Sequence, residues 1–456
     1  MPLPFTNKEV LKMLSESKAE KVKLAITDID GILRGKVISI EKFKSIAEKG
    51  FGFCDVVFGW DAGDVAYDNA SITGWHTGYP DATAVIDPKT FRRVPWENDL
   101  PFLLADFRDP KGNDLVVCPR SLLKRINAQA EKSGYTAFFS QEFEWFNFVN
   151  NVSELYENNF RPLKPMTHGM FGYSILRASQ ESSFFHELFD LLKKFDVPLE
   201  GIHTETGPGV YEAAILYAGT IEAADRAVLF KSGVKEIAHR HGLIASFMAK
   251  WNENLPGCSG HVHQSIWSGD GKQNLFYDKK TKSGMSSFME SYIAGQLYCM
   301  PHILPLFAPT VNSYKRLVEG AWAPTTLTWA IDNRTTALRA LPGSPNSSRL
   351  ETRVVGSDSN PYLAMAGCLA SGLYGVKKKM KLKTPATVGS GYANKSGGVL
   401  PRNLWEATQA MKNSDVAKEL LGADFVDHFA RTREWEWRQF SKVVTDWELR
   451  RYFEII

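Results

Sequence analysis

Apolar and polar residues alternate along much of the N-terminal quarter of the chain, which predicts strands there. Residues 21–39, KVKLAITDIDGILRGKVIS, hold two apolar runs on either side of Asp-Gly, as in a β-hairpin. Further short strands are expected at 82–88 and 102–115, the second ending in the turn DPKGN. Helical spacing of apolar residues predicts a helix before the hairpin, over 7–17.

The pattern changes near residue 114. A helix is expected over 121–134, where it ends at a glycine, and longer helical patterns follow at 181–195, 222–242 and 360–380. The sequence therefore predicts an α+β protein. Its two parts are a small strand-rich domain at 1–114 and a large mixed domain at 115–456.

Composition narrows the class of protein. The 456 residues are 44% hydrophobic and 23% charged, which is typical of a globular protein with more than one domain. Lys plus Arg number 54 against 51 for Asp plus Glu, so we expect neither a nucleic-acid nor a membrane partner. The five cysteines form no CxxC pair, and neither a signal peptide nor a membrane span is evident, so a cytoplasmic location is expected.

Four extended segments, QEFEWF, HTETGPGVYE, SGHVHQS and RLETR, carry polar side chains two residues apart. On a strand such residues share one face. The residues concerned are Glu142 and Glu144, His203 and Glu205 followed by Glu212, His261 and His263, and Glu351 and Arg353. Each pair alone fits a solvated strand face. Together, beside bulky apolar neighbours, they predict a site in which a cation offsets the carboxylates.

The types of side chain indicate the chemistry. Carboxylates with imidazole and no thiolate suit Mg²⁺ or Mn²⁺ better than structural zinc. Arginines supply forks for phosphates and carboxylates, and the candidates are Arg316, Arg334, Arg339, Arg349 and Arg353. Neither a Walker-type nor a kinase-type glycine loop is evident, so we expect phosphoryl transfer from a nucleotide held in an unusual site.

Four motifs, NSYKRL, NRTTALR, GHVHQS and RLETR followed by NPYL, together resemble the glutamine synthetase superfamily. The resemblance runs from DIDGILRGKV to VTDWELRRYFEII, almost the whole chain. It implies a β-grasp N-terminal domain, a catalytic domain with antiparallel strands, and a ring, decamer or dodecamer, with active sites at subunit interfaces. It also implies that ATP phosphorylates the γ-carboxylate of L-glutamate before a nitrogen nucleophile displaces phosphate.

Matching positions carry the family's roles onto this chain. The ligands of the metal nearest glutamate would be Glu144, Glu205 and Glu212, and those of the metal that bridges the ATP phosphates would be Glu142, His261 and Glu351. Glutamate would be held by Arg316, Arg353 and Gly257, with Glu144 orienting it through the metal. The transferring phosphoryl group would face Arg334 and Arg339, and ATP would contact His263, Ser265 and Arg349.

The nitrogen pocket departs from the family. Trp322 stands where glutamine synthetase has a glutamate that accepts a proton from ammonium, and Met170 stands where it has a tyrosine. Asp61 matches the aspartate that helps deprotonate ammonium, and Asp64 replaces a serine nearby. A carboxylate with apolar walls suits an amine that bears carbon. The alternative for Trp322 is a plug that only seals its loop.

These departures lead to the hypothesis of an ATP-dependent ligase that joins the γ-carboxylate of L-glutamate to a primary amine. Polyamines fit the acidic residues, and small alkylamines fit the apolar ones, so the identity of the amine stays open. A first alternative is a glutamine synthetase that uses ammonium. A second alternative, of another class, is a non-catalytic scaffold that keeps the ring but not the reaction.

Overall fold

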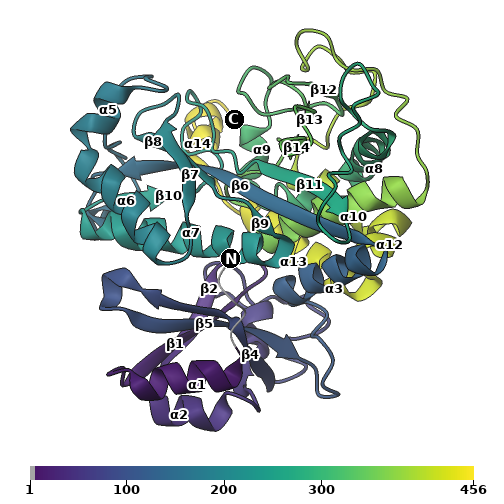
Figure 1. Cartoon of the computed structure of the whole chain (residues 1–456). Helices are drawn as coiled ribbons and strands as arrows, with labels where there is room; N and C mark the ends of the chain where they lie inside the picture. Colours follow the sequence, from purple (N-terminus) through teal and green to yellow (C-terminus); the bar gives the residue numbers. More distant parts are fainter. Residues whose placement is uncertain (1–5) are drawn as a thin grey trace.

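A computed structural model describes residues 6–456 of the protein; Met1–Phe5, on which the absence of a signal peptide partly rests, lie outside the described residues. The N-terminal part forms one sheet in the order β2-β1-β5-β4-β3. Its strands are β1 (Lys21–Thr27), β2 (Leu33–Ser39), β3 (Phe51–Cys54), β4 (Asp81–Val94) and β5 (Leu100–Arg108). Helices α1 (Asn7–Glu16) and α2 (Ile40–Ile46) cover it. Figure 1 shows this unit in purple and blue below the rest of the chain.

The β1–β2 hairpin turns where the sequence predicts it. Asp28 Oδ1 accepts the backbone N–H groups of Asp30 at 3.0 Å and Ile32 at 2.9 Å. Gly31 adopts φ +82°, a conformation that costs glycine little because it has no Cβ. The predicted helix at 7–17 and the hairpin are therefore confirmed. The strand predicted at 82–88 is longer than expected, because β4 continues to Val94 through an irregularity between Asp87 and Arg92.

The remainder of the chain is built on a second, larger sheet. Its main path is β12-β13-β14-β11-β6-β8-β7, and β9 and β10 also pair with β6. The strands are β6 (Tyr135–Phe148), β7 (Leu199–Thr204), β8 (Val210–Ile215), β9 (Ala218–Gly219), β10 (Ile244–Ser246), β11 (Val262–Ser268), β12 (Trp329–Ile331), β13 (Leu338–Leu341) and β14 (Arg349–Thr352). Neighbours along this path are antiparallel except β12 and β13.

Helices bury one face of this sheet and leave the other face to polar side chains. Phe143 and Trp145 of β6 are 0% exposed and pack with Phe230 of α7. The helices of the large domain are α3 (Pro119–Lys132), α4 (Val152–Glu157), α5 (Ile175–Gln180), α6 (Ser182–Lys194), α7 (Thr220–Arg240), α8 (Ser287–Ile303), α9 (Ser313–Arg316), α10 (Pro361–Lys377), α11 (Leu404–Lys412), α12 (Asp415–Leu421), α13 (Ala423–Phe440) and α14 (Asp446–Tyr452). Short 3₁₀ turns occupy Asp55–Phe58, Pro95–Glu97 and Leu304–Leu306.

A buried ion network joins the two sheets. Arg120 of α3 donates to Asp106 and Asp87 of the small sheet, both at 2.9 Å, and to Asp225 of α7 at 2.8 Å. Tyr362 of α10 also donates to Asp225, at 2.6 Å. One guanidinium thus holds carboxylates from β4, β5 and α7, which fixes the small domain against the large one.

The α+β prediction is confirmed. The first sheet ends before residue 114 and the second begins after it, and the division into 1–114 and 115–456 stays a prediction. Within residues 6–456, no helix combines the length and the apolar character that a membrane crossing requires.

Candidate functional site

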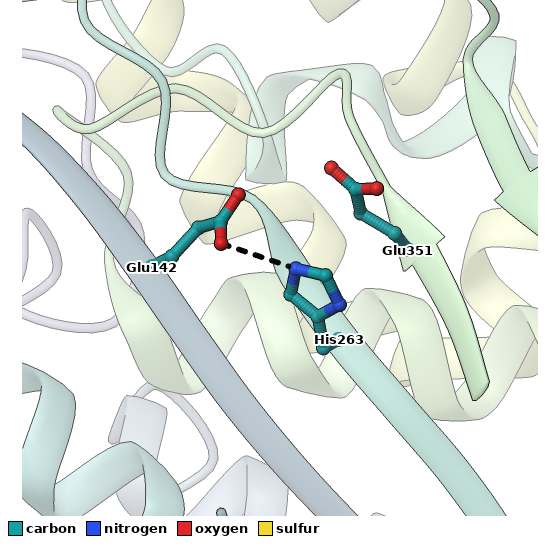
Figure 2. Close-up of side chains that lie close together, drawn as sticks. All are labelled: Glu142, His263 and Glu351. Carbon is teal, nitrogen blue, oxygen red and sulfur yellow. Dashed lines mark ion pairs between the residues drawn. The ribbon is translucent and has the colours of Figure 1, made fainter. Parts of the chain in front are cut away.

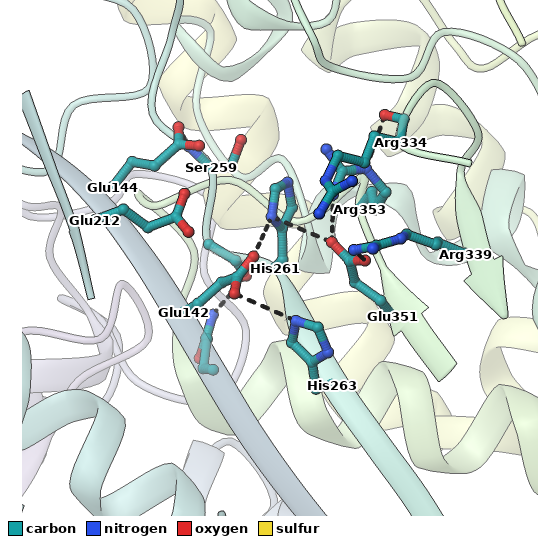
Figure 3. Close-up of polar contacts among 12 residues, drawn as sticks. Glu142, Glu144, Glu212, Ser259, His261, His263, Arg334, Arg339, Glu351 and Arg353 are labelled. Atoms are coloured by element: carbon teal, nitrogen blue, oxygen red, sulfur yellow. Dashed lines mark hydrogen bonds and ion pairs between the residues drawn. The ribbon is translucent and has the colours of Figure 1, made fainter. Parts of the chain in front are cut away.

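Strand β6 brings two acidic residues to the open face of the large sheet. Glu142 and Glu144 point away from the helices because the residues between and beside them, such as Phe143, fill the core. The register aligns Glu144 with Glu212 on β8. On the other side of β6, β11 pairs with β14 so that His263 lies opposite Glu351. Segments far apart in the sequence thus deliver their polar side chains to one place (Figure 3).

The first cluster contains two carboxylates and two imidazoles. His261 Nδ1 lies 2.9 Å from Glu142 Oε1 and 3.4 Å from Glu351 Oε1. His263 Nε2 lies 3.4 Å from Glu142 Oε2, the contact drawn in Figure 2. Ligand atoms of Glu142, His263 and Glu351 all fall within 4.8 Å of one another. The geometry therefore offers two imidazoles for one ion, where the resemblance assigns only His261.

The second cluster is mainly acidic. His203 Nε2 lies 3.3 Å from Glu205 Oε1 and 3.7 Å from Glu212 Oε1, and the three side chains form another group within 4.8 Å. Glu144 Oε2 accepts the backbone N–H of Ser259 at 2.6 Å. His203 has no counterpart among the ligands that the resemblance implies, although it stands two residues before Glu205 in the sequence. The spacing of two residues between His203, on β7, and Glu205, just after it, is the feature of the sequence that indicates His203.

The pKa values of two carboxylates show how strongly the charges within the clusters interact. Burial, with the negative charges of Glu142 and Glu144, raises the pKa of Glu212 well above its ordinary value. Burial also acts to raise the pKa of Glu351, but His263 and Arg353 outweigh it and lower that pKa to about 2. Converging carboxylates of this kind disfavour one another's ionisation unless a cation compensates their charge.

Three arginines surround Glu351. Arg339 Nη1 donates to Glu351 Oε2 at 2.9 Å, and its Nη2 donates to Asp332 at 2.6 Å. Arg353 pairs with the other oxygen of Glu351, and its Nε donates to the carbonyl of Arg334 at 3.0 Å. The structure thus brings Arg334, Arg339 and Arg353 to one side of the first cluster (Figure 3).

Arg316 lies behind this group and is 1% exposed. It donates to the carbonyls of Val354 at 2.9 Å and Arg353 at 3.1 Å, and to Ser259 Oγ at 3.0 Å, while its Nε has no partner. Gly257 packs against it so closely that a Cβ there would come within 2.9 Å of Arg316 Cγ. Of the five N–H groups of Arg316, the one on Nε and one on Nη1 therefore have no acceptor in the protein.

The residues predicted to contact ATP lie at the edge of the first cluster. Arg349 Nε donates to His263 Nδ1 at 3.3 Å. Ser265 follows His263 by two residues on β11, and its Oγ accepts from Trp267 at 2.9 Å. The three predicted residues, His263, Ser265 and Arg349, therefore share one face of β11 and β14.

Four predicted residues contact no member of the clusters through a hydrogen bond or ion pair among the described residues. Asp61 accepts from Trp435 Nε1 on α13 of the large domain at 3.0 Å, and Asp64 pairs with Arg34 within the small domain at 2.7 Å. Met170 is 50% exposed and Trp322 is 57% exposed. Within one chain, Trp322 is therefore not packed beneath its loop as a plug would be.

Tyr392 is a candidate site residue that the sequence does not indicate. Its hydroxyl is buried without a hydrogen-bond partner. Burial raises its pKa, while the charges of Arg353 and Arg316 and the backbone N–H of Trp322 act to lower it, which places the phenol among the groups predicted to hold glutamate. Nothing local in GSGYANKSGG signals this position, because the fold alone brings 392 beside 316, 322 and 353.

Comparison with known proteins agrees with this geometry. Residues 116–452 match the family model described as "Glutamine synthetase, catalytic domain". The chain is 51% identical to type-1 glutamine synthetase 2 of Dictyostelium discoideum, over 98% of this chain and 86% of the relative. It is 34% identical to glutamate–isopropylamine ligase of a Pseudomonas species, over 98% of this chain and 99% of the relative.

Two further matches extend the comparison. A γ-glutamylethanolamide synthetase of Streptomyces coelicolor is 34% identical, over 99% of this chain and 96% of the relative. Among solved structures, GmaS without ligand superposes with a TM-score of 0.84 at 26% identity, covering 98% of this chain and all (100%) of that one. The similarity therefore covers nearly the full length of the chain.

Proposed function

This chain belongs to the glutamine synthetase family, and on that premise we propose that it joins the γ-carboxylate of L-glutamate to a primary amine. Members of this family are ATP-dependent carbon–nitrogen ligases, and the chain is one of them. The proposal concerns the nitrogen donor, which we assign to a polyamine or a small alkylamine rather than to ammonium. The position of Trp322 is the observation that carries it.

The two clusters fit divalent ions. His261 Nε2 is buried without a partner, and the raised pKa of Glu212 reflects carboxylates that lack a counter-charge. We assign one ion to Glu142, His261, His263 and Glu351, and the other to Glu144, Glu205 and Glu212 with His203 beside them. Oxygen-rich sets with imidazole suit Mg²⁺ or Mn²⁺. Such ions neutralise charge on the phosphates and on the γ-carboxylate.

The chain's own residues then position the reactants. Arg316, through its free Nε, and Arg353 bind the carboxylates of glutamate, and Gly257 lets the backbone approach it. Arg334 and Arg339 offset charge on the phosphoryl group as the γ-carboxylate oxygen attacks phosphorus and ADP leaves. His263, Ser265 and Arg349 hold ATP. Catalysis in this scheme is mainly positioning and electrostatics.

The second step determines the nitrogen donor. The amine nitrogen attacks the acyl carbon, phosphate leaves, and the proton passes to Asp61, or to Asp64, of an adjacent subunit in a ring. An indole can neither accept this proton nor pair with ammonium. Trp322 and Met170, both largely exposed toward solvent in one chain, instead offer apolar surface to the carbon chain of an amine.

The names of the relatives support two candidates for the nitrogen donor, an amine and ammonium. Glutamate–isopropylamine ligase and γ-glutamylethanolamide synthetase support an amine, since each is 34% identical to this chain. The Dictyostelium relative, at 51%, is named a glutamine synthetase and favours ammonium as the second candidate. A scaffold without activity is disfavoured, because it has no physical need for two converging sets of acidic ligands.

The decisive measurement is steady-state release of ADP with L-glutamate, ATP and Mg²⁺, comparing ammonium, methylamine, isopropylamine, ethanolamine, putrescine and spermidine. We expect turnover with at least one amine at concentrations where ammonium is ineffective. Turnover with sub-millimolar ammonium and with none of the amines would establish the glutamine synthetase alternative. A folded protein that fails to bind Mg²⁺–ATP by calorimetry would instead be the scaffold.

A matched pair of variants separates the metal site from overall folding. Glu144→Ala removes a proposed ligand on the open face of β6 and should abolish turnover with every nitrogen donor. Glu131→Ala, on the exposed end of α3, should leave turnover unchanged. Equal activity in the two variants would remove Glu144 from the mechanism.

A further inference from the structure

A cavity of about 380 Å³ lies between the small domain and the large domain. Its walls come from the small-domain segments around Asp30 and Asp61, from α7 and β10, and from α13. Lys231 on α7 lies 5.7 Å from the ring of Phe143, on the face of β6 opposite Glu142. The cavity is therefore on the helix side of the sheet, where Figure 1 shows α7 running above the small domain.

Two lysines line this cavity without an acidic partner. Lys231 donates only to the carbonyl of Ser359, at 3.2 Å, and lies over Phe247, as does Lys235 one turn later. Neither lysine forms an ion pair within residues 6–456. Burial and the neighbouring charge of Lys235 lower the pKa of Lys231 to about 7, against the opposing charge of Asp358, and burial lowers the pKa of Lys235. An anion beside them would remove this cost.

Three carboxylates line the same cavity and form no salt bridge in the described chain, although the charge of Asp358 acts on Lys231 and that of Glu436 on Arg433. Asp358 is held by Thr310 and Ser313 through one oxygen, but its Oδ1 has no partner. Glu436 on α13 makes no ion pair, and burial raises its pKa. Asp61 accepts only N–H groups.

The neutral lining also lacks partners and is in part apolar. The Tyr67 hydroxyl is buried, with the residue 2% exposed, and has no hydrogen-bond partner. Ile32, Ile244 and Met248 contribute apolar surface. The remaining charges, Arg433 and Asp30, neutralise each other at 2.7 Å. The volume suits a ligand of amino-acid size.

Charges of both signs that form no ion pair across this half-open cavity, with apolar surface between them, indicate a ligand that carries both signs and an apolar group. We propose that this cavity binds a free α-amino acid with an apolar side chain, separately from the catalytic glutamate. Its carboxylate meets Lys231 and Lys235, its ammonium meets the carboxylates of Asp358 and Glu436, and its side chain lies on Ile244 and Met248. The bound molecule would join the two domains.

The test uses L-leucine as the probe and calorimetry on the full-length protein without ATP. Two half-molecules serve as chemical controls: 4-methylpentanoate lacks the ammonium group, and isopentylamine lacks the carboxylate. We expect L-leucine to bind at least about tenfold more tightly than either half-molecule, because each half leaves one set of charges unpaired. Saturating L-glutamate should not displace L-leucine, since a charged side chain does not suit the apolar wall.

Variants complete the test. Lys231→Met and Glu436→Gln should each weaken L-leucine binding about tenfold or more, with KM for glutamate unchanged, whereas Lys194→Met on exposed α6 should bind as the wild type does. Circular dichroism confirms that each variant is folded. Absence of L-leucine binding to the wild type, displacement by L-glutamate, or equal binding of a half-molecule would each overturn the proposal. The outcomes with L-leucine, 4-methylpentanoate and L-glutamate do not depend on which nitrogen donor the enzyme uses. Because isopentylamine is itself a small primary amine, its binding counts against the proposal only where Glu436→Gln weakens it.

Discussion

Trp322 adopts φ +57° in the loop that follows Arg316, a left-handed conformation that a bulky residue rarely takes. Gly320, two residues earlier, has φ +80° and lets the loop turn. The indole is 57% exposed in one chain although it is among the largest apolar groups of the protein. A strained backbone that presents an exposed aromatic ring beside Arg316 is consistent with a contact made outside the core.

Changing Trp322 should therefore alter selectivity rather than stability. In Trp322→Glu, kcat/KM for the preferred amine should fall about tenfold or more, because apolar contact is lost, and use of ammonium should rise. Trp322→Phe should retain most amine selectivity. Steady-state kinetics with both donors and the thermal midpoint check this. A lower midpoint with unchanged selectivity would identify Trp322 as a plug.

At the scale of elements, strand β6 serves two functions at once. Its alternation sends Phe143 and Trp145 into the helical core and Glu142 and Glu144 to the open face. Helix α3 likewise does more than cover the sheet, since Arg120 ties it to both domains. Packing on one side of an element thus fixes the position of reactive side chains, or of another domain, on its other side.

Removal of the Arg120 guanidinium should destabilise the protein strongly. Arg120→Met leaves the buried carboxylates of Asp106 and Asp225 without their main counter-charge, which costs about 3–5 kcal/mol. Lys132→Met, at the exposed end of the same helix, should change little. Urea unfolding of the two variants measures the difference. Equal midpoints would show that the network contributes little net stability.

His428 on α13 gives the fold a dependence on pH. It is 0% exposed, neither ring nitrogen has a partner, and burial lowers its pKa from 6.5 to about 4. The folded state favours the neutral ring. The stability that His428 contributes is therefore complete above pH 6.5 and is lost as pH falls toward 4. Between pH 6.5 and 5 the loss should be roughly 2 kcal/mol.

Unfolding in urea at pH 7.5 and pH 5 tests this expectation. The stability of His428→Leu should fall less than that of the wild type between the two values, because leucine takes up no proton on unfolding. His186→Leu, on the exposed surface of α6, provides the control. The same loss in the wild type and His428→Leu would assign the pH effect to other groups.

At the scale of the whole molecule, the proposed proton acceptors and the metal clusters lie in different domains. Asp61 belongs to the N-terminal part and is hydrogen-bonded to Trp435 of its own chain, whereas Glu144 is on β6 of the large sheet. The resemblance to ring-forming enzymes resolves this separation if Asp61 reaches the site of an adjacent subunit. A single chain then contains every residue of the proposed mechanism but not in one place.

Complementation between two inactive variants tests the proposed assembly. Asp61→Asn and Glu144→Ala should each have little activity alone. Co-expressed as mixed rings, they should recover about a quarter of the wild-type turnover, because random mixing gives one site in four an intact Glu144 and a neighbour's intact Asp61. Turnover per site and the mass of the particle are measured together. Mixed rings without recovered activity would place the proton acceptor within the same chain.

Local patterns in the sequence are sufficient to predict several of the elements and the types of ligand. Periods of two along 141–146 and 349–353 required Glu142 with Glu144, and Glu351 with Arg353, to share a face, because side chains alternate on a strand. The turn at Gly31 and the first helix also followed from local chemistry alone. The motifs then supplied the family, which the comparison confirmed.

Which of these residues meet depends on the pairing of strands that are far apart in the sequence. Pairing of β6 with β8 and β11, and of β11 with β14, sets Glu144 opposite Glu212 and His263 opposite Glu351. It also brought in His203 and Tyr392, whose surroundings come from distant segments. Register between strands depends on the whole buried core, and a local pattern carries no information about it. The cavity between the domains has the same origin, since its unpaired charges come from segments that only the fold brings together.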